Sequence, residues 1–329
     1  MSLNRRSFPT TFVPPFLFVA LLAVLATRMF LLNDLALLDP SEGRFAASAQ
    51  HLLLTGNWVM PMTFDTQAGW EPYWAKPPLL TWLVAVSMKL FGYTEFAARF
   101  PSAVASFVSL FALWVFANRF FDRRLAVVAV LLACSTIGGF FVGFGVVTDP
   151  LLAACVSCGV VAFALHADQH LYSGLIVFLA AALGVLTKGP VAAVLIGGII
   201  FTWCLTYKRW EALIRLPWLS GILLFLVVAV PWFVLAERAT PGYLRYYLLQ
   251  ENFYRYISVH LAEHIRFGSA HRHAYGMSLV FLLLMSLPWS LLLLRARLTS
   301  IRSAWASTVT NPWIGFVCIW GLFPALFFV

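Results

Sequence analysis

The sequence predicts an all-α polytopic membrane protein, and three observations support that class. Hydrophobic residues make up 62% of the 329 residues and charged residues 11%, whereas a soluble domain averages about 45–50% and about 25%. The apolar residues are grouped in runs of roughly 20, the length that a helix needs to cross a bilayer. The Lys and Arg residues behind the net charge of +9 lie in short clusters between these runs. A nucleic-acid-binding protein would gather them in a basic patch, so we expect no nucleic-acid partner.

We expect about nine transmembrane helices in a single membrane domain that comprises residues 1–329. Clusters of Lys and Arg punctuate the linkers, and the positive-inside rule places them on the cytoplasmic side. These clusters lie at 5–6, 119–124, 208–215 and 295–302. The chain stops within an apolar run, so its C-terminus looks truncated. The predicted spans are 14–32, 97–118, 124–144, 149–166, 171–187, 190–207, 217–235, 275–294 and 312–329.

This topology places four polar segments on the external face. Two of them are long loops, at 34–96 and 236–274, and two are short turns, at 148–149 and 187–190. A pump or secondary transporter would instead place ionisable groups at mid-membrane depth and show paired repeats. Loops as long as the first are more often functional than mere connectors, so we take it as the catalytic loop.

The first external loop contains two predicted surface helices. Residues 41–55 show helical periodicity, with Phe45, Ala49 and Leu52 on one face, and Gly56 ends the helix. Residues 79–90 form the second amphipathic helix, which follows two prolines and precedes Gly92. Both are short, so we expect them to lie on the membrane surface.

Three carboxylates are candidates for chemistry. Asp39 and Glu42 follow the first span directly, and Asp149 begins a later span. Asp39 or Ser41 could equally cap a helix, and Glu42 would be favoured in its first turn by the helix dipole. An Asp before Pro150 can likewise start a helix. Capping does not exclude catalysis, so both interpretations stay open.

The candidate cations are Arg44, Lys76, Lys188 and Arg255. Lys76 follows Trp74 in an aromatic segment, which is typical either of an interfacial lysine or of a cation that meets a lipid phosphate. Lys188 lies in a tight Thr-Lys-Gly-Pro turn, where it could also simply extend its ammonium to water.

No metal or cofactor is expected. His260, Glu263 and His264 lack the HExxH spacing of a zinc site, and an amphipathic surface helix explains them equally well. Cys155 and Cys158 form a CxxC inside an apolar run, where thiols are usually packing residues.

Taken together, the motifs resemble the bacterial superfamily of aminoarabinose transferases and protein O-mannosyltransferases. The resemblance extends over almost the whole chain in order, and the combination of motifs is specific although no single one is. The motifs are residues 39–46, 56–58, 76–82, 91–102, 148–151, 186–190, 230–232, 251–256 and 287–289.

The resemblance implies a GT-C membrane glycosyltransferase of the cytoplasmic (inner) membrane whose active site faces the periplasm. Such enzymes move a sugar from a polyprenyl phosphate to a lipid, glycan or protein acceptor, by an inverting single displacement. We expect Glu42 or Asp39 to be the base, with Asp149 in support. Lys76, Arg44, Lys188 and Arg255 would then stabilise the leaving phosphate beside Trp74.

Two positions depart from the family pattern. Ser41 stands where members usually have an aspartate, and Ala75 where they often have a glutamate. A lipid-linked sugar flippase or a catalytically degenerate subunit therefore remains the alternative function.

Overall fold

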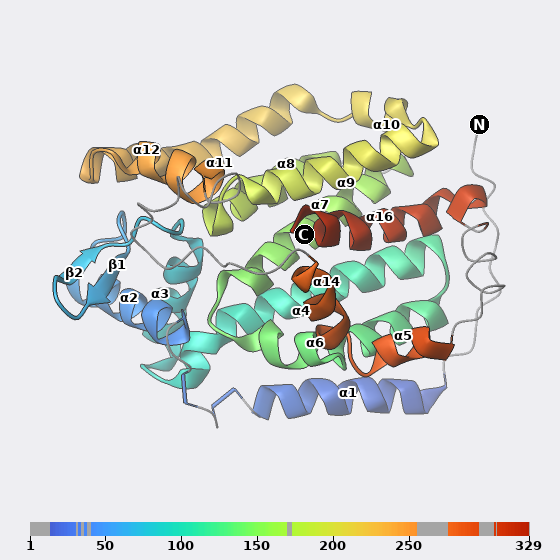
Figure 1. The fold of residues 1–329 in the computed structure, drawn as a ribbon, viewed down its shortest axis with the longest axis horizontal. Coiled ribbons are helices and arrows are strands. Elements are labelled where there is room, and N and C mark those ends of the chain that lie inside the picture. The colour runs from blue at the N-terminus through green and yellow to red at the C-terminus, as the bar shows by residue number, and fades with distance from the viewer. Residues whose placement is uncertain are drawn as a thin grey trace.

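The structure is a computed structural model that describes residues 14–30, 32–33, 36–37, 41–169, 173–254, 276–295, 306 and 308–328. The longer helices run side by side along the long axis of the molecule, and a cap of short elements covers one end (Figure 1). The structure is almost entirely helical, as the sequence predicts. Its longer helices are α1 (Pro15–Phe30), α4 (Glu95–Phe120), α5 (Arg123–Cys134), α7 (Thr148–Ala167), α8 (Ser173–Lys188), α9 (Val191–Tyr207), α11 (Trp218–Ala239) and α16 (Pro312–Phe327).

Three of the described helices are long and apolar enough to cross a membrane, namely α4, α7 and α11. Helices α1, α8, α9 and α16 are shorter and equally apolar, and each coincides with a predicted span. These apolar helices make the protein polytopic, whereas the predicted total of nine spans stays a prediction.

Helix α7 lies at the centre of the bundle and packs against α4, α8 and α9. Small residues allow this close packing, as is usual between membrane helices. A Cβ at Gly159 would lie 2.9 Å from Ile196, and one at Gly184 would lie 2.5 Å from Ala192. At the end of the bundle away from the cap, Asp168 after α7 pairs with Arg119 of α4, so these two linkers lie on the same side.

Two predicted spans are interrupted. The span expected at 124–144 consists of α5, α6 (Ile137–Phe141) and the short 3-10 helix η1 (Val142–Phe144). Side-chain hydroxyls cause this break, because Ser135 donates to Leu131 O and Thr136 Oγ1 accepts from Gly139 N. The span expected at 275–294 is divided into α14 (Met277–Met285) and the 3-10 helix η4 (Trp289–Arg295), since Pro288 has no N–H for a continuous helix.

A buried arginine holds the first helix to this broken segment. Arg28 of α1 is buried, and its guanidinium lies 3.9 Å from the centroid of the Phe144 ring. It also donates to Gly139 O. Ionisable residues in membrane segments usually face the protein interior and find such partners.

The cap contains the two predicted surface helices, α2 (Ser41–Thr55) and α3 (Leu79–Phe91). Between them lies an antiparallel hairpin that the sequence analysis missed, formed by β1 (Met62–Asp65) and β2 (Gly69–Pro72). Its turn is built around Asp65, whose carboxylate accepts from the backbone N–H groups of Gln67 and Ala68. These bonds lower the pKa of Asp65.

The other half of the cap follows α11, which extends further than the predicted 217–235. The short helix α10 (Trp210–Ile214) precedes α11 in the chain. The short helix α12 (Tyr243–Arg245) follows α11, and the π-helix η2 (Tyr246–Tyr254) continues from α12. The carboxylate of Glu237 accepts from the N–H groups of Gly242 and Leu244, which lowers its pKa and fixes the bend between α11 and α12.

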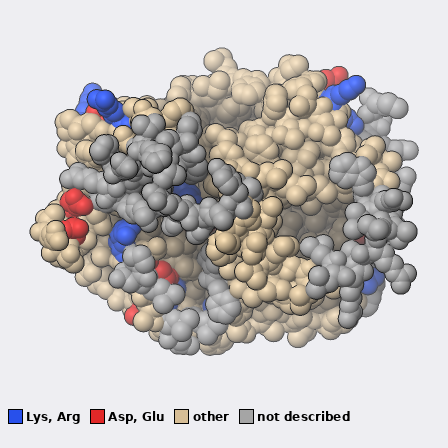
Figure 2. Space-filling view, in the orientation of Figure 1, with Lys and Arg blue, Asp and Glu red and all other residues tan. Residues whose placement is uncertain are grey.

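Charged side chains on the face shown in Figure 2 gather towards the two ends of the molecule and leave the band between them uncharged. This distribution fits a bundle whose middle lies in hydrocarbon.

Candidate functional site

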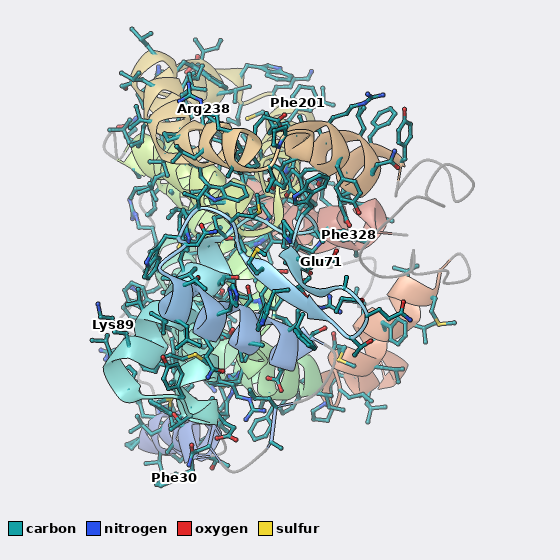
Figure 3. All side chains as sticks on the ribbon, turned by 90° about the vertical axis from the view of Figure 1, so that its left-hand side faces the viewer. Phe30, Glu71, Lys89, Phe201, Arg238 and Phe328 are labelled. Carbon is teal, nitrogen blue, oxygen red and sulfur yellow. The ribbon has the colours of Figure 1, made fainter. Side chains whose placement is uncertain are left out.

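The described parts of the four polar segments that were predicted to share one face lie at one end of the bundle, which faces the viewer in Figure 3. The hairpin, marked there by Glu71, lies between α2 and α11. Two apolar clusters hold the segments together. One joins α2 and α3 to Val146 and Leu151 at the start of α7. The other joins Met60 and Leu186 to Tyr243 and Tyr247.

Glu42 is the most tightly held of the predicted catalytic residues. It is buried, and Arg99 donates to both of its carboxylate oxygens, at 3.1 Å to Oε1 and 2.9 Å to Oε2. The backbone N–H of Val146 also donates to Oε1, at 2.9 Å. The same guanidinium donates to Leu32 O and Ala36 O. Arg99 therefore connects the end of the first span, α2 and α4, while Glu42 connects α2 to the approach to α7.

This geometry gives Glu42 a positioning role, because a bidentate Arg–carboxylate pair fixes both the distance and the plane of the two groups. Its predicted role as the base remains a prediction. Ser41 lies exposed at the first residue of α2. Asp39, the other predicted base, lies outside the described residues.

Arg44 is half-buried on α2 and turns towards the segment before α3. Its Nη1 is 3.4 Å from the hydroxyl of Tyr73, and its guanidinium carbon is 5.6 Å from the centroid of the Tyr73 ring. An arginine can use both contacts at once because its planar fork also stacks on aromatic faces.

Lys76 contacts a residue that the sequence analysis did not select. Its Nζ lies 3.9 Å from Oε2 of Glu251 on the π-helix η2. The Glu251 side chain is 1% exposed and that of Lys76 is 24% exposed, so water or a ligand can reach the ammonium. Two residues before Lys76, the ring of Trp74 packs on Tyr243 and Tyr246 at centroid distances of 6.3 Å and 5.5 Å.

Asp149 and Lys188 form a second ion pair, with 2.5 Å between Oδ1 and Nζ. They come from different helices, at the start of α7 and the end of α8. Their side chains are 55% and 23% exposed, respectively. The pair thus presents an accessible carboxylate beside a cation at the cap end of the bundle.

The turn after Lys188 receives the π-helix. Gly189 has φ +92°, and a Cβ there would lie 2.1 Å from the Tyr247 hydroxyl and 3.2 Å from Asn252 Oδ1. The side-chain amide of Asn252 donates to Tyr247 O at 2.7 Å. Only glycine permits this approach, both for its backbone angle and for the space that it leaves.

Tyr243 and Tyr247 fill the space between the two halves of the cap. Their rings stack with centroids 5.4 Å apart. Burial raises the pKa of Tyr243, and the nearby Tyr247 and Glu251 raise it further. The phenol of Tyr243 therefore stays neutral at physiological pH.

Sequence reasoning missed Arg99, Tyr247 and Glu251 as site residues. Arg99 and Glu251 both stand inside motifs that carried the family resemblance, at 91–102 and 251–256, so the signal was present. Arg255, a predicted substrate-binding residue, lies outside the described residues.

Within the part of the chain that the structure describes, no group of three or more His, Cys, Asp or Glu residues could hold a metal ion. His260, Glu263 and His264 lie outside that part. Cys155 and Cys158 are free thiols on α7.

Comparison with known proteins finds a matching family model, similar sequences and a similar fold. Residues 75–234 match the family model described as dolichyl-phosphate-mannose-protein mannosyltransferase. An undecaprenyl phosphate-α-4-amino-4-deoxy-L-arabinose arabinosyl transferase of Proteus mirabilis is 28% identical over 311 residues, which are 92% of this chain and 52% of the relative. One from Pseudomonas fluorescens is 30% identical over 88% of this chain and 50% of its own length. The chain thus spans about half the length of these relatives.

The fold resembles a solved structure. It superimposes on the crystal structure of ArnT from Cupriavidus metallidurans bound to undecaprenyl phosphate with a TM-score of 0.81 and 23% identity. The match covers 94% of this chain and 55% of that one. The apo state of the same protein matches with a TM-score of 0.74.

Proposed function

We propose that this chain, which is similar to aminoarabinose transferases and matches the mannosyltransferase family model over residues 75–234, transfers a sugar from a polyprenyl-phosphate donor to an acceptor hydroxyl. The observation that carries the proposal is the presence of two ion pairs, Lys76 with Glu251 and Lys188 with the exposed carboxylate of Asp149, at one end of an apolar bundle. Such an end lies where the phosphate of a membrane-bound polyprenyl lipid is found.

The reaction needs a base and a cation. The base takes the proton from the acceptor hydroxyl, the acceptor oxygen attacks C1 of the sugar, and the bond from C1 to the phosphate oxygen breaks. Among the described carboxylates, Asp149 is the best candidate for the base, because its side chain is the more exposed one in its ion pair. Asp39 is the second candidate, and Glu42 would position the loop that carries it.

The leaving phosphate gains negative charge in the transition state, so fixed cations beside it lower the barrier. Lys76 is the main candidate, since its ammonium is partly exposed and already lies against a buried carboxylate. Arg44, Lys188 and Arg255 are assigned supporting roles, and the Trp74 ring shields the phosphate from water.

The protein would act as a multi-pass protein of the cytoplasmic membrane with this end facing the periplasm. The clusters of Lys and Arg in the opposite linkers support that orientation. The donor would be a polyprenyl-phosphate sugar, and the acceptor a lipid, another glycan or a protein.

The test is transfer of a labelled sugar from a polyprenyl phosphate in proteoliposomes. We expect Lys76→Ala and Asp149→Asn to lower transfer by at least about 100-fold, as removal of a transition-state cation or a general base does. Asp39→Asn and Glu42→Gln complete the series and identify the base. Transfer that survives all four changes would overturn the proposal.

Three observations favour a second function, as a lipid-linked sugar flippase or a degenerate subunit. Position 41 is a serine, Ala75 is buried in an apolar cluster, and both oxygens of Glu42 are engaged. A flippase would move the labelled lipid across the bilayer without consuming it, so the same vesicles separate the two functions.

A further inference from the structure

Glu251 contributes a buried negative charge next to the proposed phosphate site. It lies on the π-helix η2 with its side chain 1% exposed, and its Oε2 is 3.9 Å from Lys76 Nζ. A carboxylate in such surroundings is costly unless a cation accompanies it. The two residues are far apart in the sequence, so their meeting depends on the docking of η2 against the first loop.

The surroundings of Glu251 make its charge effective over several ångströms. Among the described groups, Lys76, on the segment before α3, pairs with Glu251, and the phenol of Tyr243 lies close enough to feel its charge. The pKa of Tyr243 is raised, chiefly by burial, so this phenol is neutral. Lys76 is thus a cation that faces Glu251, and the burial of the Glu251 carboxylate limits the screening of its charge.

A phosphate bound to Lys76 would share the ammonium with Glu251. A phosphate oxygen at the usual charge-assisted distance of about 2.8 Å from Nζ would lie within about 7 Å of the Glu251 carboxylate. Two negative charges at that separation repel each other, while the lysine attracts both.

The charge of the phosphate changes during the proposed reaction. The donor is a phosphodiester with one negative charge. When the bond between C1 and the phosphate oxygen breaks, the phosphate leaves as a monoester, whose second pKa is about 6 and whose charge at pH 7 is about −1.5 to −2. The carboxylate of Glu251 therefore repels the product more strongly than the donor.

We propose that Glu251 selects between the two lipids: its carboxylate weakens binding of the polyprenyl phosphate monoester relative to the phosphodiester donor, and so promotes product release. This inference rests on the proposed function, because it takes the phosphate to bind at Lys76. It assigns a specificity-determining role to a residue that also positions the Lys76 ammonium.

The test compares the affinities of two probes, undecaprenyl phosphate and its methyl ester, which differ by one charge at pH 8. Glu251→Gln keeps the size of the side chain and removes its charge. We expect this change to strengthen binding of the monoester about 10-fold more than binding of the methyl ester. This factor of about 10 follows from the interaction energy of two unit charges about 7 Å apart at an effective dielectric constant near 20, after that energy is reduced for screening.

Two further measurements sharpen the test. At pH 5 the monoester carries about one charge, as the diester does, so the difference between native protein and Glu251→Gln should shrink towards none. Glu251→Asp withdraws the carboxylate from Lys76 by about one methylene. It should shift the ratio of the affinities for the monoester and the methyl ester in the same direction, by about 3-fold. This variant provides the answer if Glu251→Gln does not fold. Glu211→Gln, at an exposed pair on α10, is the control for loss of a remote carboxylate.

The outcomes separate this inference from the proposed function. If Lys76→Ala leaves the affinity of both probes unchanged, the phosphate does not bind there and the proposed function loses its main cation. If Lys76→Ala weakens both probes but neither change at Glu251 alters their ratio, the inference alone is wrong. An equal gain for both probes would also overturn it, because a purely positional role would not distinguish one charge from two.

Discussion

The contact between the turn after α8 and the π-helix η2 gives a sharp prediction. Gly189→Ala introduces a methyl group 2.1 Å from the Tyr247 hydroxyl and 3.0 Å from its ring carbon Cζ, at a backbone angle of φ +92°. Tyr247 is 1% exposed and packed on Tyr243, so it cannot move aside without disturbing the cap. We expect a loss of about 2–4 kcal/mol in the free energy of unfolding, from about 1 kcal/mol of backbone strain and about 1–3 kcal/mol of overpacking.

The chain offers a matched control for this change. Gly242 has a similar φ of +95°, but nothing lies within 4 Å of a Cβ at that position. Gly242→Ala should therefore cost only the strain, about 1 kcal/mol. Both variants are compared with native protein by equilibrium unfolding in detergent, followed by tryptophan fluorescence. In the double variant that combines Gly189→Ala with Tyr247→Ala, the loss of stability should be smaller than the sum of the losses in the two single variants, because the two residues share one contact.

The binding of undecaprenyl phosphate completes the assay, since displacement of η2 would carry Glu251 away from Lys76. We expect Gly189→Ala to alter that binding and Gly242→Ala to leave it near the native value. Equal losses of stability in the two alanine variants, with additive losses in the double variant, would refute the reasoning.

Three further predictions follow from the ion pairs and the cap. Arg99→Lys should lower the free energy of unfolding by about 2–4 kcal/mol, because a lysine cannot replace the bidentate contact with a buried carboxylate; the exposed Arg215→Lys should change it by less than about 1 kcal/mol. Lys188→Ala should lower transfer by at least about 10-fold while Lys188→Arg retains most of it, because the cation beside Asp149 is kept; equal rates in both variants would exclude a role for the charge. Glu237→Gln should reduce the loss of stability in acid: backbone donors lower the pKa of Glu237 below its ordinary 4.5, so its contribution is present at neutral pH and is lost as the pH falls through that lowered pKa. Thermal unfolding between pH 7 and pH 3 measures the difference, and parallel curves for the two proteins would contradict it.

Hydrophobic periodicity predicted the helices well because it reports which faces are apolar and where runs end. The two surface helices were predicted at 41–55 and 79–90, and the structure places them at Ser41–Thr55 and Leu79–Phe91. Their glycine ends were also visible, since Gly56 and Gly92 both have positive φ. The break in the span predicted at 124–144 was not, because the hydroxyls of Ser135 and Thr136 act on the backbone without changing hydropathy.

The hairpin between the surface helices escaped prediction for a different reason. Its strands have only four residues each, too few to show the alternation that identifies a strand. The exposed side chain of Phe64 and the buried one of Thr63 also oppose the usual pattern. The hairpin is fixed instead by its turn at Asp65 and by the register of Phe64 opposite Trp70.

Sequence patterns revealed the charged residues of the site but not their partners. Each of the three ion pairs that the described residues form at the cap end joins segments that are distant in the chain: Glu42 with Arg99, Lys76 with Glu251, and Asp149 with Lys188. A helical period shows that a residue lies on a polar face, and it contains no information about the residue that faces it from another helix. Glu42 illustrates the consequence, because the sequence favours it equally as a cap and as a base, while its bidentate contact with Arg99 gives it the position of a structural residue.

These pairs also explain how a site can form at the end of an apolar bundle. The helices α4, α7 and α8 pack through small residues and bring Arg99, Asp149 and Lys188 to one end, where the first loop supplies Glu42 and Lys76. The site therefore depends on the packing of the bundle: a larger residue at Gly184 of α8 would meet Ala192 of α9 and Cys155 of α7, and should disturb the pair of Asp149 and Lys188 as well. The charged groups are held by the apolar core below them, so the chemistry at the cap depends on residues that never touch a substrate.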